Sequence, residues 1–275
     1  MSSDEQLERD FIDELLMRAI LSALAAGDML VNERAGDLEI DSKGAPTDVV
    51  TVMDRRSEEL LADHLLSGRE SDGILGEEGA SVDGTSGVRW IVDPIDGTVN
   101  YMYRLPEWAV SIAAELDGEV VAGVVHAPAL GETFVAGKGK GAALHKQGVQ
   151  RKLVVNQAPS MDRALVATGF GYDVGRRKKQ ASVVAEVIPQ VRDIRRAGAA
   201  SVDICSLAAG RVDAYYERGL KPWDHAAAGL IAQEAGATIG GLDGQPAGED
   251  FYLAAPEPLF SDLSELLARL DAASD

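Results

Sequence analysis

Apolar residues recur at helical spacing near the start of the chain. Between residues 4 and 30, two series are spaced by four: Leu7, Phe11, Leu15, and Ile12, Leu16, Ile20. With acidic residues between them, this spacing predicts an amphipathic helix over 4–30. A second helix is expected from Asp54, which can cap its first turn. Its buried side would carry Leu60, Leu61, Leu65 and Leu66.

The pattern then changes to short apolar runs of the kind found in strands. They lie at 74–75, 90–92, 108–113, 120–125, 133–135 and 142–144. Asp117-Gly118 separates two of these runs and is typical of a hairpin turn. The first part of the chain is therefore predicted to hold two helices and a largely antiparallel sheet.

From about residue 160, strand-like and helical segments alternate. Strands are predicted at 164–167, 193–195, 212–216 and 237–239, and helices at 176–190, 200–209, 224–235 and 257–272. Such alternation favours helices packed over a mixed sheet. We expect two subdomains, 1–158 and 159–275. Because no low-complexity linker separates them, they are expected to share a core.

Composition narrows the cellular setting. The 275 residues contain no apolar stretch of about 18 and begin without a basic segment followed by an apolar one. Neither a membrane span nor a secretory signal is expected. The single cysteine, Cys205, lies in an apolar run and is predicted to be buried. These features favour a cytoplasmic protein.

The charge balance excludes several partners. There are 45 acidic and 26 basic residues, a net charge of −19. Nucleic acid and anionic membranes require a concentrated basic face, so neither is an expected partner. A small anionic substrate would also be repelled unless bound cations reversed the local field. Acids on the first helix fit a role in solubility, but acids within apolar or turn segments do not.

The densest group of such acids follows the apolar run Trp90-Ile91-Val92. Asp93 ends this run, a turn at Pro94 follows, and Asp96 precedes Gly97-Thr98. Two carboxylates in one turn repel each other unless a cation or a proton neutralises them. Oxygen ligands favour Mg²⁺, Mn²⁺ or Ca²⁺ over zinc. The alternative is a pair of turns at a strand end, with no ligand.

Two further segments deliver acids at the ends of predicted elements. Glu77 and Glu78 follow a short apolar strand and lie between glycines, and Asp224 follows Trp223 at the start of an apolar helix. Alone, these would be solvated acids and a helix N-cap. Together with Asp93 and Asp96, they predict a site for two or more divalent ions.

Four motifs in this order resemble those of the inositol monophosphatase family. They are Asp48-Val49-Val50-Thr51-Val52-Met53-Asp54, Gly76-Glu77-Glu78, Asp93-Pro94-Ile95-Asp96-Gly97-Thr98 and Trp223-Asp224. They extend over residues 48–224, and the chain length fits the whole family domain. The resemblance implies an α+β fold, a layered αβαβα sandwich in which an antiparallel sheet with helices precedes a smaller α/β unit.

The resemblance also implies a set of metal ligands. Glu77, Asp93 and the carbonyl of Ile95 would hold a first ion, and Asp93, Asp96 and Asp224 a second. Glu77 and waters would hold a third ion more loosely. The expected cofactor is Mg²⁺, two or three ions per site, with Mn²⁺ as a possible substitute. Glu78 is expected to support these ligands without binding a metal ion directly.

Catalytic roles follow from the same resemblance. Thr98, hydrogen-bonded to Asp48, would orient a water molecule on the metal that Glu77 helps to hold. The N–H groups of Gly97 and Thr98 would bind the phosphate, with Asp96 and Asp224 close to the substrate. Phosphate would pass directly to water, with no covalent enzyme intermediate.

The organic part of the substrate would meet residues later in the chain. Gly198, Ala199 and Ala200 resemble the family segment beside the substrate ring. The carboxylate of Glu217 can accept hydrogen bonds from the hydroxyl groups of a polyol. The expected substrate is myo-inositol monophosphate. Histidinol phosphate, a 3′-phosphonucleotide, fructose-1,6-bisphosphate and a non-catalytic scaffold role are the alternatives. The resemblance further implies inhibition by lithium and a homodimer.

Two basic segments invite other interpretations. The glycine- and lysine-rich residues 136–142 lie between strand-like runs and do not fit the P-loop pattern, so a plain loop is predicted. The run from Arg176 to Lys179 is predicted to be the solvated start of a helix. A contact with the substrate phosphate is the less favoured alternative.

Overall fold

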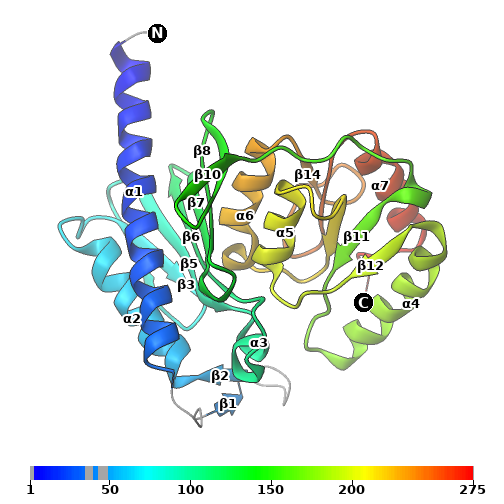
Figure 1. Ribbon diagram of the computed structural model, residues 1–275, viewed down its shortest axis with the longest axis horizontal. Helices are drawn as coiled ribbons and strands as arrows, with labels where there is room; N and C mark the ends of the chain where they lie inside the picture. The colour runs from blue at the N-terminus through cyan, green and yellow to red at the C-terminus, as the bar shows by residue number, and fades with distance from the viewer. Residues whose placement is uncertain (1–2, 35–39, 43–48, 275) are drawn as a thin grey trace.

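The computed structural model describes residues 3–34, 40–42 and 49–274, arranged in five layers (Figure 1). Helices α1 (Ser3–Asn32) and α2 (Val52–Leu66) cover the outer face of an eight-stranded sheet. Helices α5 (Ala200–Ala208) and α6 (Pro222–Glu234) separate it from a five-stranded sheet. Helices α4 (Val174–Val187) and α7 (Leu259–Arg269) cover the far side. The predicted αβαβα sandwich is confirmed.

The larger sheet has the strand order β10-β9-β8-β7-β6-β5-β3-β4. Its strands are β3 (Gly73–Gly76), β4 (Ser81–Val82), β5 (Val88–Asp96), β6 (Ala109–Leu116), β7 (Glu119–Ala127), β8 (Glu132–Gly137), β9 (Gly141–Lys146) and β10 (Val149–Lys152). Neighbours run antiparallel except β3 and β5, which are parallel. The β6–β7 hairpin turns at Asp117-Gly118, as predicted, and both residues have positive φ. Residues 138–140 form the plain loop expected between β8 and β9.

The smaller sheet is mixed, as predicted. Its order is β12 (Asp193–Arg195), β11 (Leu165–Thr168), β13 (Ala214–Glu217), β15 (Tyr252–Ala255) and β14 (Thr238–Gly240). β11 runs parallel to both of its neighbours, whereas β15 runs antiparallel to β13 and β14. β15 was not predicted, because four apolar residues show no alternation by which a strand is recognised.

Shorter elements complete the described chain. They are the strands β1 (Ile40–Ser42) and β2 (Val49–Thr51), the helix α3 (Thr98–Tyr103), and 3₁₀ turns at Pro128–Leu130, Met161–Arg163 and Ile188–Gln190. The last of these continues α4, which explains the single helix predicted over 176–190. Within the described ranges, no helix is both long and apolar enough to cross a membrane.

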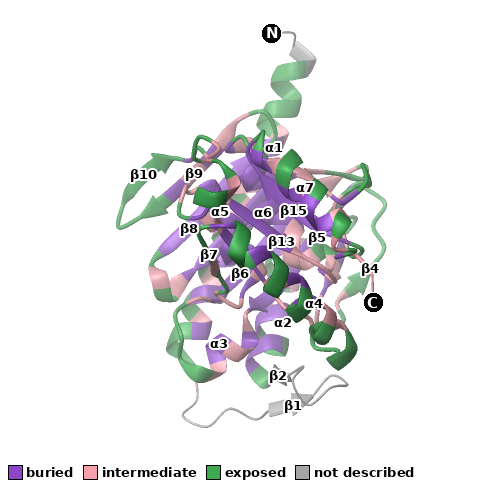
Figure 2. Ribbon diagram, turned by 90° about the vertical axis from the view of Figure 1, so that its right-hand side faces the viewer, coloured by how far each residue is buried: buried purple, intermediate pink, exposed green. Residues whose placement is uncertain are grey.

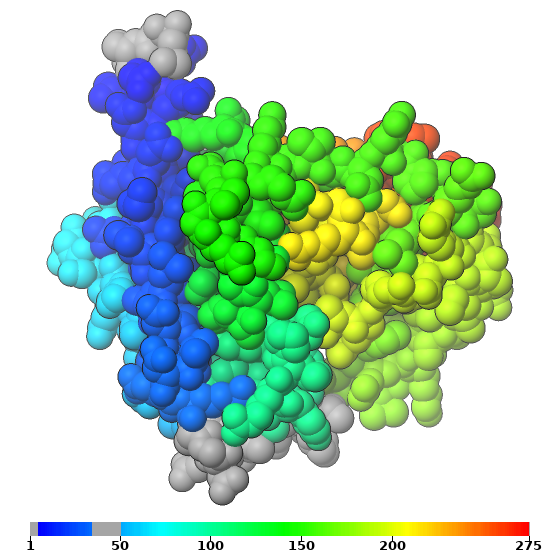
Figure 3. Space-filling view, viewed as in Figure 1, coloured from blue at the N-terminus to red at the C-terminus, as the bar shows by residue number. Residues whose placement is uncertain are grey.

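One apolar core joins the two sheets. Ile91 and Ala113 of the larger sheet, Ala227 of α6 and Tyr215 of the smaller sheet belong to the same buried cluster. In Figure 2 the inner strands and α6 are largely buried. The expectation of a shared core is thus confirmed. Figure 3 shows α1 along one flank, with its first turns projecting beyond the rest of the molecule.

Helices α2 and α6 begin before the acids that were predicted to cap them. Thr51, and not Asp54, is the N-cap of α2, and α6 begins at Pro222 instead of Asp224. Both acids are the third residue of their helix and accept the backbone N–H of the capping residue, Asp54 from Thr51 at 2.8 Å and Asp224 from Lys221 at 2.6 Å. An acid at this position is half of a capping box, which resembles an N-cap in sequence.

Candidate active site

A cavity of about 410 Å³ opens where β5, α3, α5 and α6 meet. Most of the predicted site residues line it: Glu77, Asp93, Ile95, Asp96, Gly97, Thr98, Gly198, Ala199, Ala200, Glu217 and Asp224. Glu78 is half-buried and is not among the lining residues. Asp48 lies outside the described residues. The fold thus brings eleven of the predicted residues, from five separate segments, to one cavity.

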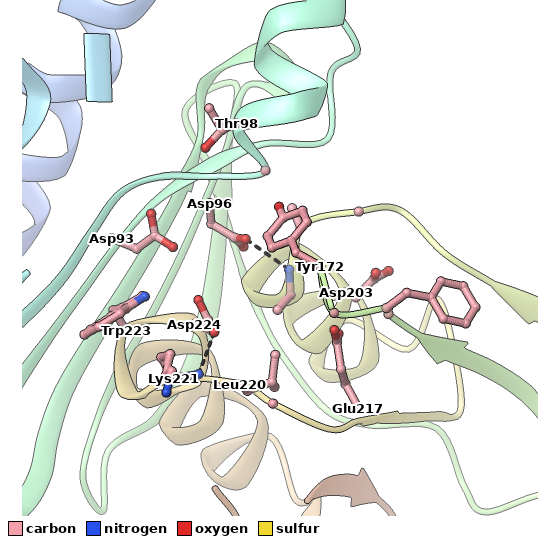
Figure 4. A pocket seen from close by; sticks show the side chains of 18 of the residues that line it. Asp93, Asp96, Thr98, Tyr172, Asp203, Glu217, Leu220, Lys221, Trp223 and Asp224 are labelled. Atoms are coloured by element: carbon pink, nitrogen blue, oxygen red, sulfur yellow. Dashed lines mark hydrogen bonds between the residues drawn. The ribbon is translucent and has the colours of Figure 1, made fainter. Parts of the chain in front are cut away.

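A bulge at the end of β5 delivers the first pair of acids. Asp93 lies opposite Ser111 of β6 and Asp96 lies opposite Ala109, so three steps on β5 match two on β6. Such a bulge re-aims side chains at a strand end. Both acids are buried, and Figure 4 shows both beside the cavity.

Gly97 makes the turn from β5 into α3. Its φ is +90°, and an added Cβ would lie only 3.0 Å from the carbonyl oxygen of Glu107 and from the Cβ of Ala199. A side chain is therefore excluded by both conformation and space. The helix α3 then begins at Thr98. Both residues line the cavity.

Asp96 is fixed by residues of α5, more than 100 residues further along the chain. Its Oδ2 accepts hydrogen bonds from the N–H of Ser201 at 2.7 Å and from the Ser201 hydroxyl at 2.5 Å, and its Oδ1 accepts from the N–H of Ala200 at 3.2 Å. The start of α5 therefore orients this acid (Figure 4). Burial raises the pKa of Asp96 to about 6, although the hydrogen bonds from Ser201 favour the ionised form.

Negative charges close together in the cavity disfavour the ionisation of Asp93 and Asp224. Burial raises the pKa of Asp93 well above its usual range, and the charges of Glu77, Asp96 and Asp224 raise it further. Burial, followed by the charges of Asp96 and Glu77, does the same to the pKa of Asp224. A bound cation would offset both effects.

The donor set fits a hard divalent cation, because it consists of carboxylates and the Ile95 carbonyl. In the described part of the chain, no three His, Cys, Asp or Glu side chains already form a metal cage. Asp96 and Asp224 instead hold backbone N–H groups. Asp96 Oδ2 accepts two hydrogen bonds from Ser201, but Asp96 Oδ1 and Asp224 Oδ2 accept one each and retain a lone pair with which to bind a cation.

Thr98 contacts Asp54, an acid not predicted here; the predicted contact with Asp48 falls outside the described residues. Its hydroxyl lies 3.1 Å from Asp54 Oδ1 and 3.1 Å from the Ile95 carbonyl oxygen. Asp54 is the second acid of the motif that begins with Asp48, and spacing alone did not decide which acid reaches Thr98. Asp54 Oδ2 also accepts from the Thr51 hydroxyl at 2.6 Å, and burial raises the pKa of Asp54. Asp54 is therefore an acidic contact of Thr98 in addition to the one that the sequence predicts.

Two acids lie on the side of the cavity opposite Asp93 (Figure 4). Glu217 accepts a hydrogen bond from the Tyr215 hydroxyl at 2.5 Å, and Asp203 accepts one from the N–H of Ala197 at 3.2 Å. Burial raises the pKa of each to about 7. Asp203 was not predicted. Its one sign in the sequence is that Asp203 is a single acid within a predicted apolar helix.

Basic residues also contribute to the lining of the cavity. Arg176, Arg196, Arg218 and Lys221 line the cavity. The glycines 171 and 219 leave room for the side chain of Arg176. Arg177 and Lys178 are exposed, as predicted for the solvated start of a helix, whereas Lys179 is half-buried. Arg176 itself therefore matches the alternative of a substrate contact.

An αβαβα sandwich with strand-end acids around one cavity defines a class of metal-dependent phosphatases. The chain belongs to the inositol monophosphatase family, whose sequence model matches residues 12–274. Members of this family generally depend on metal ions, and the family resemblance is confirmed.

Relatives and solved structures agree with this placement. "Inositol-1-monophosphatase SuhB" of Mycobacterium tuberculosis is 45% identical over 240 residues, covering 86% of this chain and 82% of the relative. "Nus factor SuhB" of Pseudomonas aeruginosa is 36% identical over 238 residues, covering 84% and 86%. The crystal structure of the extragenic suppressor protein suhB from Bartonella henselae superposes with a TM-score of 0.86 at 32% identity, covering 92% and 98%.

Proposed function

We propose that this chain is a Mg²⁺-dependent phosphate monoesterase that hydrolyses myo-inositol monophosphate. The observation that carries the proposal is the two-ended cavity. Asp93, Asp96 and Asp224 lie at one end, and Glu217 and Asp203 lie at the other. A phosphate and the polyol that bears it would each meet groups suited to them. Relatives named inositol-1-monophosphatase support the same substrate class.

The proposed metal ligands are those expected from the sequence. Glu77, Asp93 and the Ile95 carbonyl would hold one Mg²⁺, and Asp93, Asp96 and Asp224 a second, with Glu77 and waters holding a third more loosely. Mn²⁺ would serve as a substitute. Bound there, the ions lower the pKa of a water molecule and stabilise the departing oxygen.

The chain's own groups would orient the reaction. When Thr98 donates its hydroxyl hydrogen to Asp54, its oxygen can accept a hydrogen bond from the attacking water. The N–H groups of Gly97 and Thr98 would hold the phosphate. Direct transfer to water also fits Cys205, which is fully buried with a raised pKa and is unsuited to act as a nucleophile.

At the other end, Glu217 and Asp203 would accept hydroxyl hydrogens of the polyol. The same carboxylates would suit the cation of histidinol phosphate, and Arg176 would suit a second phosphate, as in fructose-1,6-bisphosphate. A 3′-phosphonucleotide remains a further alternative. Inhibition by lithium and a homodimer are parts of the proposal.

A second candidate function rests on the relatives named Nus factor, from Pseudomonas aeruginosa and Escherichia coli. In that case the chain would act as a non-catalytic scaffold. The four motifs argue for catalysis, since a scaffold does not require Asp93, Asp96 and Asp224 around one cavity.

A panel of phosphate monoesters tests the substrate. Phosphate release is measured in Mg²⁺ for myo-inositol 1-phosphate, histidinol phosphate, a 3′-phosphonucleotide and fructose-1,6-bisphosphate, with Asp96→Asn as the blank. We expect the highest kcat/KM for inositol phosphate and a loss of orders of magnitude in the blank. A preference for another ester would keep the hydrolytic reaction and replace the substrate. Release from none of them by folded protein would refute the enzyme and favour the scaffold.

A further inference from the structure

Three side chains on one face of α2 contact the segments that carry the proposed metal-binding groups. Asp54 contacts Thr98 at the start of α3. The Ser57 hydroxyl donates to the carbonyl oxygen of Pro94, in the turn between Asp93 and Asp96, at 3.2 Å. Glu58 contacts the turn between β3 and β4, which begins with Glu77. All three side chains are buried.

Glu58 holds this turn through its backbone. Its Oε2 accepts the N–H of Glu78 at 2.8 Å, and its Oε1 accepts the N–H of Ala80 at 2.7 Å. The side chain is 6% exposed. Two hydrogen bonds to an ionised acceptor are stronger than neutral ones. They therefore fix both sides of the turn to α2.

Gly76 makes this approach possible. A Cβ at Gly76 would overlap the carboxylate of Glu58, so only glycine lets the acid come this close. Gly76 also donates its N–H to the Ala80 carbonyl oxygen at 2.7 Å, and the N–H of Glu77 reaches the Val92 carbonyl oxygen at 3.3 Å. The turn is thus held by β5 on one side and by α2 on the other.

We infer that Glu58 is a positioning residue that fixes the backbone of Glu77 and so sets its carboxylate for metal binding. The inference rests on the proposed function in taking Glu77 as a ligand. Partners behind a metal ligand typically contribute 10–100-fold to metal affinity or activity, roughly the scale expected here. Nothing in the motifs pointed to Glu58. Its place on the buried side of α2 was its one signal in the sequence.

Glu58→Gln tests the inference, with Glu59→Gln as the matched control. Both substitutions make the same change at adjacent positions of α2, but Glu59 is exposed. Mn²⁺ alone is titrated into each full-length protein by calorimetry. We expect Glu58→Gln to bind Mn²⁺ about 10–100-fold more weakly and Glu59→Gln to match wild type. The Mg²⁺ concentration for half-maximal phosphate release should shift likewise, and kcat at saturating Mg²⁺ should change little, since a merely unstable variant would not show this split.

Gly76→Ala gives a second route to the same contact, because its Cβ displaces the Glu58 carboxylate. Gly76→Ala alone should also weaken Mn²⁺ binding. The double variant, Gly76→Ala with Glu58→Gln, should lose less Mn²⁺ affinity than the product of the two single losses. Thermal unfolding shows whether each variant is folded.

Equal Mn²⁺ affinities of Glu58→Gln and Glu59→Gln would overturn the inference. If wild type hydrolyses phosphate esters and Glu58→Gln behaves normally, only the inference fails. If wild type binds Mn²⁺ but releases no phosphate, the proposed function fails and the Mn²⁺ titrations still decide the role of Glu58. Wild type that binds no Mn²⁺ contradicts both.

Discussion

Replacing Asp54 with asparagine should separate catalysis from stability. The carboxylate accepts hydrogen bonds from the Thr51 N–H, from the Thr51 hydroxyl and from the Thr98 hydroxyl, at 2.8, 2.6 and 3.1 Å. Asparagine keeps one acceptor oxygen and adds an NH₂ group. If the oxygen stays on Thr51, the NH₂ group faces Thr98, and the Thr98 hydroxyl loses its acidic partner.

The loss of stability and the loss of activity should differ in size. Losing one or two of these bonds costs roughly 1–3 kcal/mol. Part of this is returned because burial raises the pKa of Asp54, so its ionised form costs stability at neutral pH. A net loss of about 1 kcal/mol would lower Tm by roughly 2–4 °C in a chain of this size. Removing a group that orients the attacking water should lower kcat about 10²–10⁴-fold.

Asp48→Asn is the comparison, because the sequence first assigned this role to Asp48. Initial rates of phosphate release in saturating Mg²⁺ and thermal unfolding are measured for both variants. The hydrogen bond between Thr98 and Asp54 predicts that Asp54→Asn loses kcat, and the loss in Asp48→Asn is measured beside it because the family resemblance assigns that role to Asp48. Loss of kcat in Asp48→Asn with a nearly normal Asp54→Asn would refute the reasoning.

Three further predictions concern the surroundings of the cavity. Ser201→Ala removes one hydrogen bond to Asp96 and should raise the Mg²⁺ needed for half-maximal rate by about tenfold, measured by Mg²⁺ titration; an unchanged requirement would show that the hydroxyl does not position Asp96. The folded pKa of Glu217, about 7, is raised above its ordinary 4.5, so the folded state binds the proton more tightly and stability should fall as pH rises between these values. Glu217→Gln should flatten that slope in urea unfolding at pH 5 and pH 8, and an unaltered slope would contradict it. Glu132 is buried in ion pairs with Arg211 and Lys146, both more than a third exposed, so Glu132→Gln should cost about 1–3 kcal/mol in urea unfolding without changing kcat; a loss of kcat in folded protein would mean that this network also serves the cavity.

Much of the site was visible in the sequence because of where its acids stand. Asp93 and Glu77 each end an apolar strand, where a charged residue has no structural use. Neighbouring strands of one sheet then bring these ends together, and β3 and β5 are parallel neighbours. At these positions the local sequence pattern and the fold both place an acid at the end of an apolar run, so the sequence was enough to predict these acids.

Other residues depend on contacts that spacing does not encode. Asp54 belongs to the motif that begins with Asp48, but its contact with Thr98 depends on how α2 packs against β5. Ser201 is 105 residues from Asp96 in sequence, and Glu58 is 20 residues from Glu78, so neither pairing is visible along the chain. The site residues themselves were predictable, but most of the residues that position them were not.

The central claim is that phosphate release depends on divalent ions held by the acid cluster. The direct test removes metal from the purified protein with a chelator and then titrates Mg²⁺ while the initial rate with myo-inositol 1-phosphate is measured. We predict no release above background in chelator and a saturable return with Mg²⁺. Full activity in excess chelator would contradict the claim.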